Sequence, residues 1–338
     1  MADISQLGWV VVAAAAVLCA GLIVLLRPLL VRYALARPNA RSSHKNPTPQ
    51  GGGVAVIAST LLVTALAYAL LPGTGAPPLE IAIVFSASVL IAVVGAADDI
   101  RTIEVAPRLA LQAIAVMAVI AAIPADTTVI PFLPWWIERL ILLIAGIWFL
   151  NLVNFMDGID WMTVAEVLPV TAGLAILGVL GALPPYGMIA ALALFGATLG
   201  FAPFNRPVAR LFLGDVGSLP LGLLIGWLLL LLAARGHLGA ALLLPLYYLA
   251  DATVTLFGRI ARREQFWLAH RTHFYQRATD NGRSVPAIVS GVLLVNIALA
   301  GLAILTVVAR GQLTRIAAMA CGALLVAAFL AWLSRGKR

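Results

Sequence analysis

The sequence predicts an all-α, polytopic integral membrane protein, a single bundle of about eleven transmembrane helices, with ten as the alternative count. Three observations predict this class. Of the 338 residues, 62% are hydrophobic and only 11% are charged, whereas globular chains carry about 25% charged residues. The mean hydropathy is +1.04. Apolar runs of about 18 residues recur along the chain, and each is long enough to cross a bilayer.

The apolar runs follow one another without a soluble domain, so residues 1–338 are expected to form one membrane domain. The runs cover residues 9–26, 52–72, 81–97, 107–123, 137–155, 162–182, 186–202, 217–234, 238–258, 285–308 and 314–333. The first run is longer than a signal-peptide core and its basic residues follow it, which predicts an uncleaved helix with its amino end outside. Cys19 and Cys321 lie singly in apolar runs, so neither a disulfide nor a thiolate metal site is expected.

The distribution of basic residues predicts which ends of the helices face the cytoplasm. Alternate threading places residues 27–51, 98–106, 156–161, 203–216, 259–284 and 334–338 on one side. All but four of the 22 Lys and Arg residues lie in these segments or at their helix edges, the exceptions being Arg139, Arg235, Arg310 and Arg315. Because cytoplasmic loops are enriched in Lys and Arg, the carboxyl end is expected in the cytoplasm. The net charge of +8 therefore indicates topology and anionic headgroups, not nucleic acid.

The unusual polar motifs all fall on this predicted cytoplasmic face, beginning with the first loop. Residues 41–45 read Arg-Ser-Ser-His-Lys and lead to a triple glycine at 51–53. Glycine N–H groups at a helix amino end can approach an anion closely, although a flexible entry turn is the alternative. Asp98 and Asp99 end the third run, where they repel each other and oppose the helix dipole. A bound cation or a proton-accepting role would resolve that conflict; a solvated turn neutralised by Arg101 is the alternative.

The most informative stretch is residues 151–160, directly after the fifth apolar run. It places Asn151, Asn154, Asp157 and Asp160 within ten positions. Such groups are costly at membrane depth, so they indicate a functional site, against the alternative of a polar loop between two helices.

Two further motifs complete the set. Asp215 stands between Gly214 and Gly217, which suits an oxygen ligand of a hard cation, although Asp215 or Ser218 could instead cap the following helix. The long basic loop contains His270, Arg271 and His273, which can contact a pyrophosphate; a basic segment lying on anionic lipid is the alternative. Asp251 lies inside the ninth run and requires a buried partner, whereas Glu166 is interpreted as structural.

Together, these motifs resemble the polyprenyl-phosphate N-acetylhexosamine-1-phosphate transferases of glycosyltransferase family 4. The resemblance extends from Arg41 to Gln276, and residues 270–276 resemble the bacterial O-antigen-initiating branch. Two positions depart from the family pattern. Trp161 replaces the usual glycine directly after residues 151–160, which we call the central motif. Ile103 stands where some members have a third aspartate. The number of metal ions is therefore left open.

The resemblance implies an active site in a cleft at the cytoplasmic face, where undecaprenyl phosphate attacks the β-phosphorus of a UDP-N-acetylhexosamine and releases UMP. It implies Mg²⁺ as cofactor, with Mn²⁺ as a substitute, because both reactants are anionic. The implied roles are Asp98 and Asp99 as catalytic residues, Asp215 as metal ligand, and Lys45, Asn151, Asn154, Asp157, Asp160, His270, Arg271 and His273 as substrate-binding residues.

The implied location is the bacterial inner membrane, where the enzyme would start O-antigen or another envelope polysaccharide. The expected partners are undecaprenyl phosphate, the UDP-sugar and the lipid bilayer; a homodimer is left open and nucleic acid is excluded. A multi-pass transporter and an inactive scaffold of polysaccharide export are the competing hypotheses. The sequence leaves open which N-acetylhexosamine is transferred.

Overall fold

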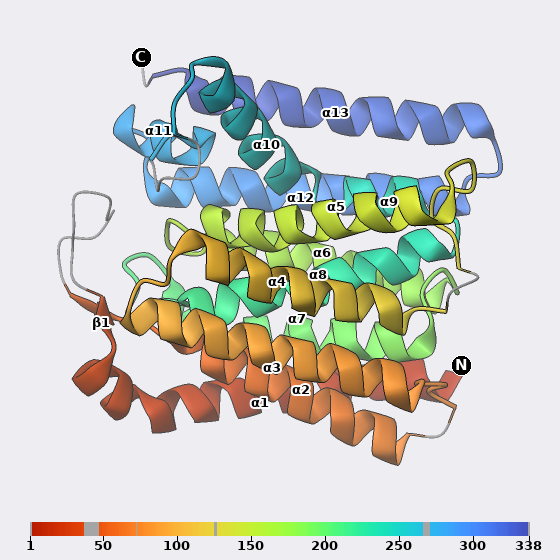
Figure 1. The fold of residues 1–338 in the computed structure, drawn as a ribbon, viewed down its shortest axis with the longest axis horizontal. Helices are drawn as coiled ribbons and strands as arrows, with labels where there is room; N and C mark the ends of the chain where they lie inside the picture. The colour runs from red at the N-terminus through yellow and green to blue at the C-terminus, as the bar shows by residue number, and fades with distance from the viewer. Residues whose placement is uncertain (1, 37–46, 72, 125–126, 266–270, 337–338) are drawn as a thin grey trace.

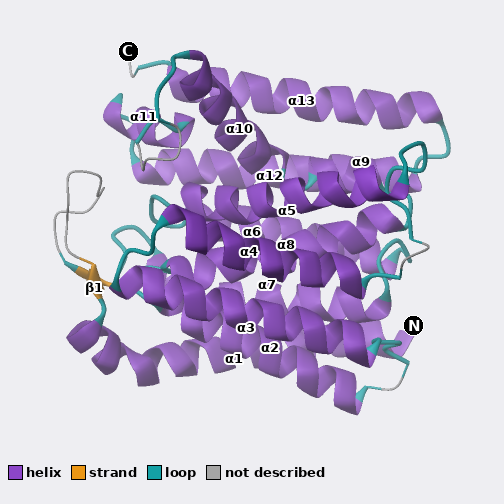
Figure 2. Cartoon of the chain, in the orientation of Figure 1, coloured by secondary structure: helices purple, strands orange, loops and turns teal. Residues whose placement is uncertain are grey.

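The protein is a helix bundle, as the sequence predicts (Figure 1). The computed structural model describes residues 2–36, 47–71, 73–124, 127–265 and 271–336. Within these ranges the helices are α1 (Ala2–Tyr33), α2 (Gly52–Leu70), α3 (Pro78–Ile100), α4 (Val105–Ala122), α5 (Trp135–Met156), α6 (Met162–Val179), α7 (Pro185–Asn205), α8 (Asp215–Ala234), α9 (Leu238–Leu243), α10 (Leu246–Ala261), α11 (Phe274–Asp280), α12 (Val285–Val308) and α13 (Gln312–Ser334). Two short strands, β1 (Leu35–Ala36) and β2 (Thr48–Pro49), pair antiparallel, with Leu35 opposite Pro49 (Figure 2).

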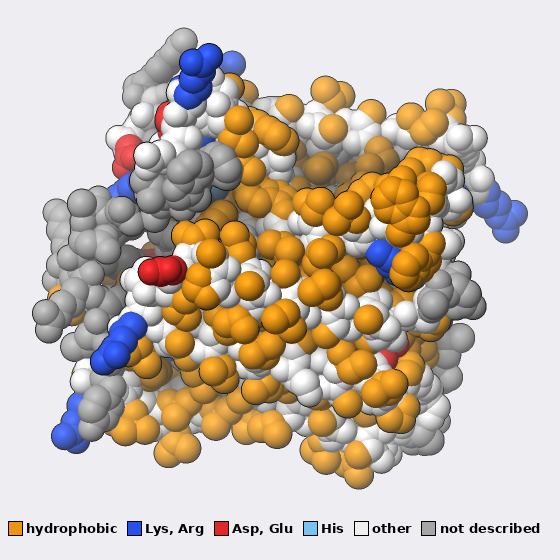
Figure 3. All heavy atoms as spheres, in the orientation of Figure 1, with side chains coloured by type: hydrophobic (Ala, Val, Ile, Leu, Met, Phe, Trp, Pro, Cys, Tyr) orange, Lys and Arg blue, Asp and Glu red, His pale blue; other side chains and the backbone are white. Residues whose placement is uncertain are grey.

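Ten of the described helices are long and apolar enough to span a membrane: α1 to α8, α12 and α13. Hydrophobic side chains cover the middle of the face shown in Figure 3, and charged side chains stand mostly toward its two ends. Exposed apolar residues are costly in water and stable in lipid, so this surface fits a hydrocarbon environment. The chain is a multi-pass membrane protein.

The predicted span at residues 238–258 is not one helix. It is divided into α9 and α10, with α9 ending at Leu243 and α10 beginning after Pro245. Proline has no N–H to donate and its ring clashes with the preceding turn, so it ends the first helix. The pair still carries the chain from one end of the bundle toward the other, because α10 runs obliquely to the end where α11 lies (Figure 1).

In the structure, the loops that were predicted to be cytoplasmic lie at one end of the bundle. The loops after α3, α5, α7 and α10 lie at the left end in Figure 1, whereas the chain starts at the right end and finishes at the left. The motifs of the sequence therefore meet at one surface of the bundle.

Helix α8 is the most deeply buried of the spans and packs against α2, α3, α5 and α9. Its first turn is approached very closely by two neighbours. A Cβ on Gly53 of α2 would lie 2.1 Å from the Cα of Gly217, and a Cβ on Gly95 of α3 would lie 2.2 Å from the carbonyl oxygen of Asp215. Only glycine permits these contacts. As a result, α2, α3 and α8 meet backbone to backbone where Asp215 begins α8.

Candidate active site

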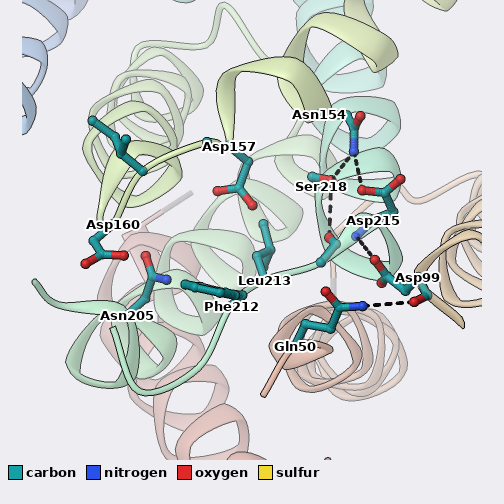
Figure 4. A pocket seen from close by; sticks show the side chains of 13 residues that line it. Gln50, Asp99, Asn154, Asp157, Asp160, Asn205, Phe212, Leu213, Asp215 and Ser218 are labelled. Carbon is teal, nitrogen blue, oxygen red and sulfur yellow. Dashed lines mark hydrogen bonds between the residues drawn. The ribbon is translucent and has the colours of Figure 1, made fainter. Parts of the chain in front are cut away.

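A polar cavity of about 230 Å³ opens at the loop-rich end of the bundle. Figure 4 shows its side chains, which come from the segment before α2, the ends of α3, α5 and α7, the turn after α5, the loop before α8 and the start of α8. The residues that line it are Gln50, Asp99, Asn154, Asp157, Gly158, Ile159, Asp160, Asn205, Phe212, Leu213, Gly214, Asp215 and Ser218. Four of the five predicted motifs thus contribute to one cavity, as the cleft prediction requires.

Asp215 stands at the first position of α8 and is oriented by Asn154 from α5. The Asn154 amide donates to Asp215 Oδ1 at 2.7 Å and to Ser218 Oγ at 2.9 Å. An amide that donates to a carboxylate fixes its rotamer without neutralising its charge. Asp215 therefore lines the cavity with an oriented carboxylate, and its role as a metal ligand stays a prediction.

Asp99 holds the beginning of α8 from the neighbouring helix α3. Its Oδ1 accepts a hydrogen bond from the backbone N–H of Asp215 at 3.0 Å, and its Oδ2 accepts one from Val216 at 3.1 Å. These N–H groups have no partner within their own helix, and a negative charge is favourable there. Gln50 donates to the Asp99 carbonyl at 3.0 Å. Asp99 thus lines the cavity and also sets the direction in which Asp215 points.

The described cavity lining does not include Asp98, although the Asp98 carboxylate lies beside that of Asp215. Its Oδ2 forms a salt bridge with Arg108 of α4 at 2.9 Å, and its Oδ1 accepts from the Ile103 N–H at 2.6 Å. Its charge still reaches Asp215. In the alternative interpretation Arg101 would neutralise this turn, but the salt bridge comes from Arg108, on the first turn of α4.

Asp157 is half-buried in the turn after α5 and lines the cavity. Burial raises the pKa of this carboxyl to about 7, the hydrogen bond from Thr163 opposes the rise, and the charges of Asp99 and Asp160 add to it. Removing water disfavours the charged form, and neighbouring carboxylates repel it. A cation brought into the cavity would therefore favour the ionised form of Asp157.

Asp160 shapes the other side of the cavity. It accepts a hydrogen bond from the Ala209 N–H at 3.0 Å, and so holds the loop between α7 and α8. Nearby, Asn205 accepts from the Trp161 N–H at 2.8 Å and donates to the Leu211 carbonyl at 3.0 Å. The two polar side chains tie the central motif to the loop that carries Phe212 and Leu213.

Trp161 adopts a left-handed backbone with φ of 62°, which explains why glycine is usual there in the family it resembles. Its indole N–H donates to the Ala202 carbonyl on α7 at 2.7 Å. The Trp161 side chain is not among the residues that line the cavity in the described part of the chain. The side chain therefore lies against α7 and leaves the cavity unobstructed.

Asn151 is the one member of the central motif that turns away from the cavity. Its amide donates to Gln112 of α4 at 2.7 Å and to the Ile147 carbonyl at 2.8 Å, while Gln112 donates back at 3.3 Å. Both amides are buried. A reciprocal amide pair satisfies polar groups that lipid would otherwise penalise. In this structure Asn151 joins α4 to α5, and a substrate contact for it remains a prediction.

The basic motif lies beside the cavity, around α11. Arg271 forms a salt bridge with Asp280 at 3.1 Å, and His273 Nδ1 lies 3.2 Å from Asp251. The described lining of the cavity includes neither residue. The predicted phosphate contacts Lys45 and His270 lie outside the described residues.

Two of the three glycines, Gly52 and Gly53, use their N–H groups in backbone hydrogen bonds. The N–H of Gly52 donates to the Phe212 carbonyl at 2.9 Å, and that of Gly53 donates to the Leu213 carbonyl at 2.8 Å. These bonds fasten the first loop to the loop before α8 and bring Gln50 to the cavity. The N–H groups of Gly52 and Gly53 are therefore not available to bind an anion, contrary to the expectation for this glycine run.

Several cavity residues were not assigned a role from the sequence. Gln50, Asn205 and Phe212 lie in the predicted cytoplasmic segments 27–51 and 203–216, so their position was the available signal. Gln112 had a signal of its own, because a lone glutamine in an apolar span requires a partner.

The composition of the cavity fits a hard cation. Asp99, Asp157, Asp160 and Asp215 bring four carboxylates together, and the described lining contains no Lys or Arg. Within the described ranges, no three His, Cys, Asp or Glu side chains are placed so that together they could hold a metal ion. Mg²⁺ suits such an open arrangement, because it takes one or two protein carboxylates and completes its octahedron with water and substrate phosphates.

The fold and the site define a class: a multi-pass membrane protein with a carboxylate-lined cavity at one end of its helix bundle. Residues 81–233 match glycosyl transferase family 4. This match supports the family that the resemblance predicts, and a place in the O-antigen branch stays a prediction.

Curated relatives agree with that assignment. The chain is 29% identical, over 59% of its own length and 54% of the relative's, to a decaprenyl-phosphate N-acetylglucosaminephosphotransferase of Mycolicibacterium smegmatis. It is 26% identical, over 78% of its length and 75% of the relative's, to a probable undecaprenyl-phosphate N-acetylglucosaminyl 1-phosphate transferase of Bacillus subtilis. A phospho-N-acetylmuramoyl-pentapeptide-transferase of Bartonella quintana is 28% identical over 38% of the chain and 40% of its own length. The chain thus spans about half the length of the first of these relatives.

Proposed function

We propose that this protein transfers N-acetylhexosamine 1-phosphate from a UDP-sugar to undecaprenyl phosphate at the cytoplasmic face of a bacterial inner membrane. The observation that carries the proposal is the polar cavity, which gathers four carboxylates and Asn154 at one end of the helix bundle. The names of the relatives support the class of acceptor and donor. The product would start O-antigen or another envelope polysaccharide.

In the proposed reaction an oxygen of the lipid phosphate forms a bond to the β-phosphorus of the UDP-sugar, and the bond between that phosphorus and the bridging oxygen breaks to release UMP. A magnesium ion held by Asp215 would supply charge neutralisation for the two anionic reactants. Asn154 orients Asp215 through their 2.7 Å hydrogen bond. Asp98 and Asp99 are the proposed catalytic carboxylates, and Asp99 is the one that lines the cavity.

An apolar groove of about 240 Å³ supports a lipid acceptor. It lies among α4, α5, α8 and α9, and its lining includes Val116, Leu142, Phe149, Gly222, Leu229 and Leu242. Phe149 and Gly222 are each about one turn from a residue of the polar cavity, Asn154 on α5 and Ser218 on α8. The same pair of helices therefore carries both sites, and we assign the groove to the polyprenyl chain.

The deciding experiment uses purified full-length protein in nanodiscs with Mg²⁺, undecaprenyl phosphate and labelled UDP-sugars. The donors are the N-acetyl derivatives of glucosamine, galactosamine, fucosamine and quinovosamine. We expect one donor to give UMP and to carry its label into the organic phase. UMP formed without polyprenyl phosphate would indicate hydrolysis, and no UMP from any donor would contradict the proposal and favour a scaffold or a transporter.

The groove assignment has its own test with two adjacent exposed residues. Ala145 lines the apolar groove, whereas its neighbour Ile144 faces outward and is absent from the described lining. Ala145→Phe should lower turnover with undecaprenyl phosphate about tenfold, because the added ring fills volume that the chain needs, and should affect a short-chain polyprenyl phosphate less. Ile144→Phe is the matched control. Equal turnover in the two variants would remove the groove from the proposal.

A further inference from the structure

Asp251 is a buried carboxylate with an unusual number of partners. It lies on α10 with 0% of its surface exposed. Its Oδ1 accepts from the Phe274 N–H at 3.0 Å and lies 3.2 Å from His273 Nδ1, and its Oδ2 accepts from the Tyr275 N–H at 3.3 Å. A buried carboxylate is tolerated only when hydrogen bonds satisfy it.

The two backbone N–H groups belong to the first turn of α11, which cannot satisfy them itself. The cap comes from another helix, 23 and 24 positions away in the chain. Two weaker contacts, from Tyr247 OH at 3.3 Å and Thr255 Oγ1 at 3.4 Å, come from α10 itself. Asp251 therefore fixes both where α11 begins and how the His273 ring is turned.

The anchored helix reaches the polar cavity through Tyr275. The Tyr275 hydroxyl donates to the Phe155 carbonyl at 3.0 Å and fills the space beside Gly158, where an added Cβ would lie 2.0 Å from that hydroxyl oxygen. Gly158 lines the cavity next to Asp157. The Tyr275 and His273 rings stack with centroids 5.9 Å apart. A continuous series of contacts thus leads from Asp251 to the central motif.

We propose that Asp251 is a positioning residue for the transfer reaction: it holds α11 so that His273 stays oriented and Tyr275 supports the Asp157 turn. Asp251 touches neither the cavity nor, on this proposal, the substrate, so its effect passes through α11. The inference rests on the proposed function, because a role in transfer presupposes that transfer occurs.

The test compares Asp251→Asn with Thr255→Val, a near-isosteric change at the longest contact of the same carboxylate. An amide in place of the carboxylate turns one acceptor into a donor that faces an N–H group, and hydrogen bonds to a charged group are among the stronger ones. We expect Asp251→Asn to lower kcat by about ten- to a hundredfold, with Thr255→Val within about twofold of wild type. Limited trypsin cleavage after Arg271 and Arg277 should become faster only in Asp251→Asn.

A double variant separates positioning from general stability. If Asp251 acts through His273, then Asp251→Asn combined with His273→Gln should be no slower than the slower single variant, because coupled residues are not additive. Multiplied defects would overturn the inference. If Asp251→Asn fails to accumulate, Tyr275→Phe provides the second route, and wild-type turnover in that variant would overturn it too.

The two failures remain distinguishable. If wild-type protein makes no UMP from any donor, the proposed function fails. Faster trypsin cleavage in Asp251→Asn would then still support its contact with α11. If wild type is active and Asp251→Asn matches Thr255→Val in turnover and cleavage, only the positioning inference fails.

Discussion

Replacing Asp99 with asparagine should disable the site without removing a metal ligand. Both oxygens of Asp99 accept backbone hydrogen bonds from the start of α8, at 3.0 and 3.1 Å. In Asp99→Asn, one of these oxygens becomes an NH₂ group that faces an N–H donor. The change removes one charge-assisted hydrogen bond, about 1.5 to 3 kcal/mol, and the favourable charge at the helix amino end, about 0.3 to 1 kcal/mol.

These losses weaken the first turn of α8, where Asp215 stands. If about 2 kcal/mol of this stabilisation was used to orient Asp215, turnover should fall at least about thirtyfold, since any direct catalytic role of Asp99 would be lost as well. Turnover is measured as polyprenyl-dependent UMP release across a magnesium series. Because the lost bonds go to N–H groups, we expect no recovery at high magnesium. Glu104→Gln, an exposed carboxylate at the amino end of α4, is the control.

Two results would refute this reasoning. Wild-type turnover in Asp99→Asn would show that α8 does not depend on the cap from α3. Recovery with added Mg²⁺ or Mn²⁺ would show that Asp99 ligates the metal directly, and the role of cap would then be secondary.

The remaining predictions concern three other residues. Asp215→Asn should abolish turnover at ordinary magnesium and recover in part at higher magnesium or with manganese, because a neutral amide oxygen is a weaker ligand; a metal-independent loss in a magnesium titration would contradict this. Trp161→Gly should keep turnover and the same preferred UDP-sugar, since the indole lies against α7; relief of the left-handed backbone, about 1 to 2 kcal/mol, offsets the lost hydrogen bond, and a changed donor preference in the labelled panel would count against it. The folded-state pKa of Asp157 is about 7, above its ordinary 3.8, so its contribution to stability is complete below pH 3.8 and is lost as pH rises through 7. The Tm of metal-free protein should therefore fall between about pH 4 and 7 and level off above about pH 7, and Asp157→Asn should flatten that slope; an unchanged slope would argue against it.

The helices could be predicted because hydrophobic length alone specifies a membrane span, and residues 52–72 or 285–308 contain little else. The break at Pro245 was not predicted, because the apolar run around this proline is long enough to form one span. The gathering of Asp99, Asn154 and Asp215 followed from threading their loops to one side. What could not be predicted depends on contacts between distant segments. Asn151 and Asn154 lie one turn apart, yet only the position of Gln112 on α4 decides that Asn151 turns away.

Asp251 is a second case in which a contact between distant segments could not be predicted. Its need for a buried partner was evident, but that partner is a backbone turn more than twenty positions away, and no residue type marks it. The left-handed conformation of Trp161 was not predicted either: the tryptophan itself does not indicate positive φ, and only the glycine usual at this position in the family hinted at it.

The apolar groove has a rim that includes Ala145 and Leu242, both exposed on the flank of the bundle. A lipid acceptor that enters there arrives by lateral diffusion and never leaves the bilayer. Its effective concentration is then its mole fraction among the surrounding lipids, not its amount per volume of solution. Adding inert phospholipid at constant acceptor should therefore slow the proposed reaction by surface dilution, while a water-soluble donor is unaffected.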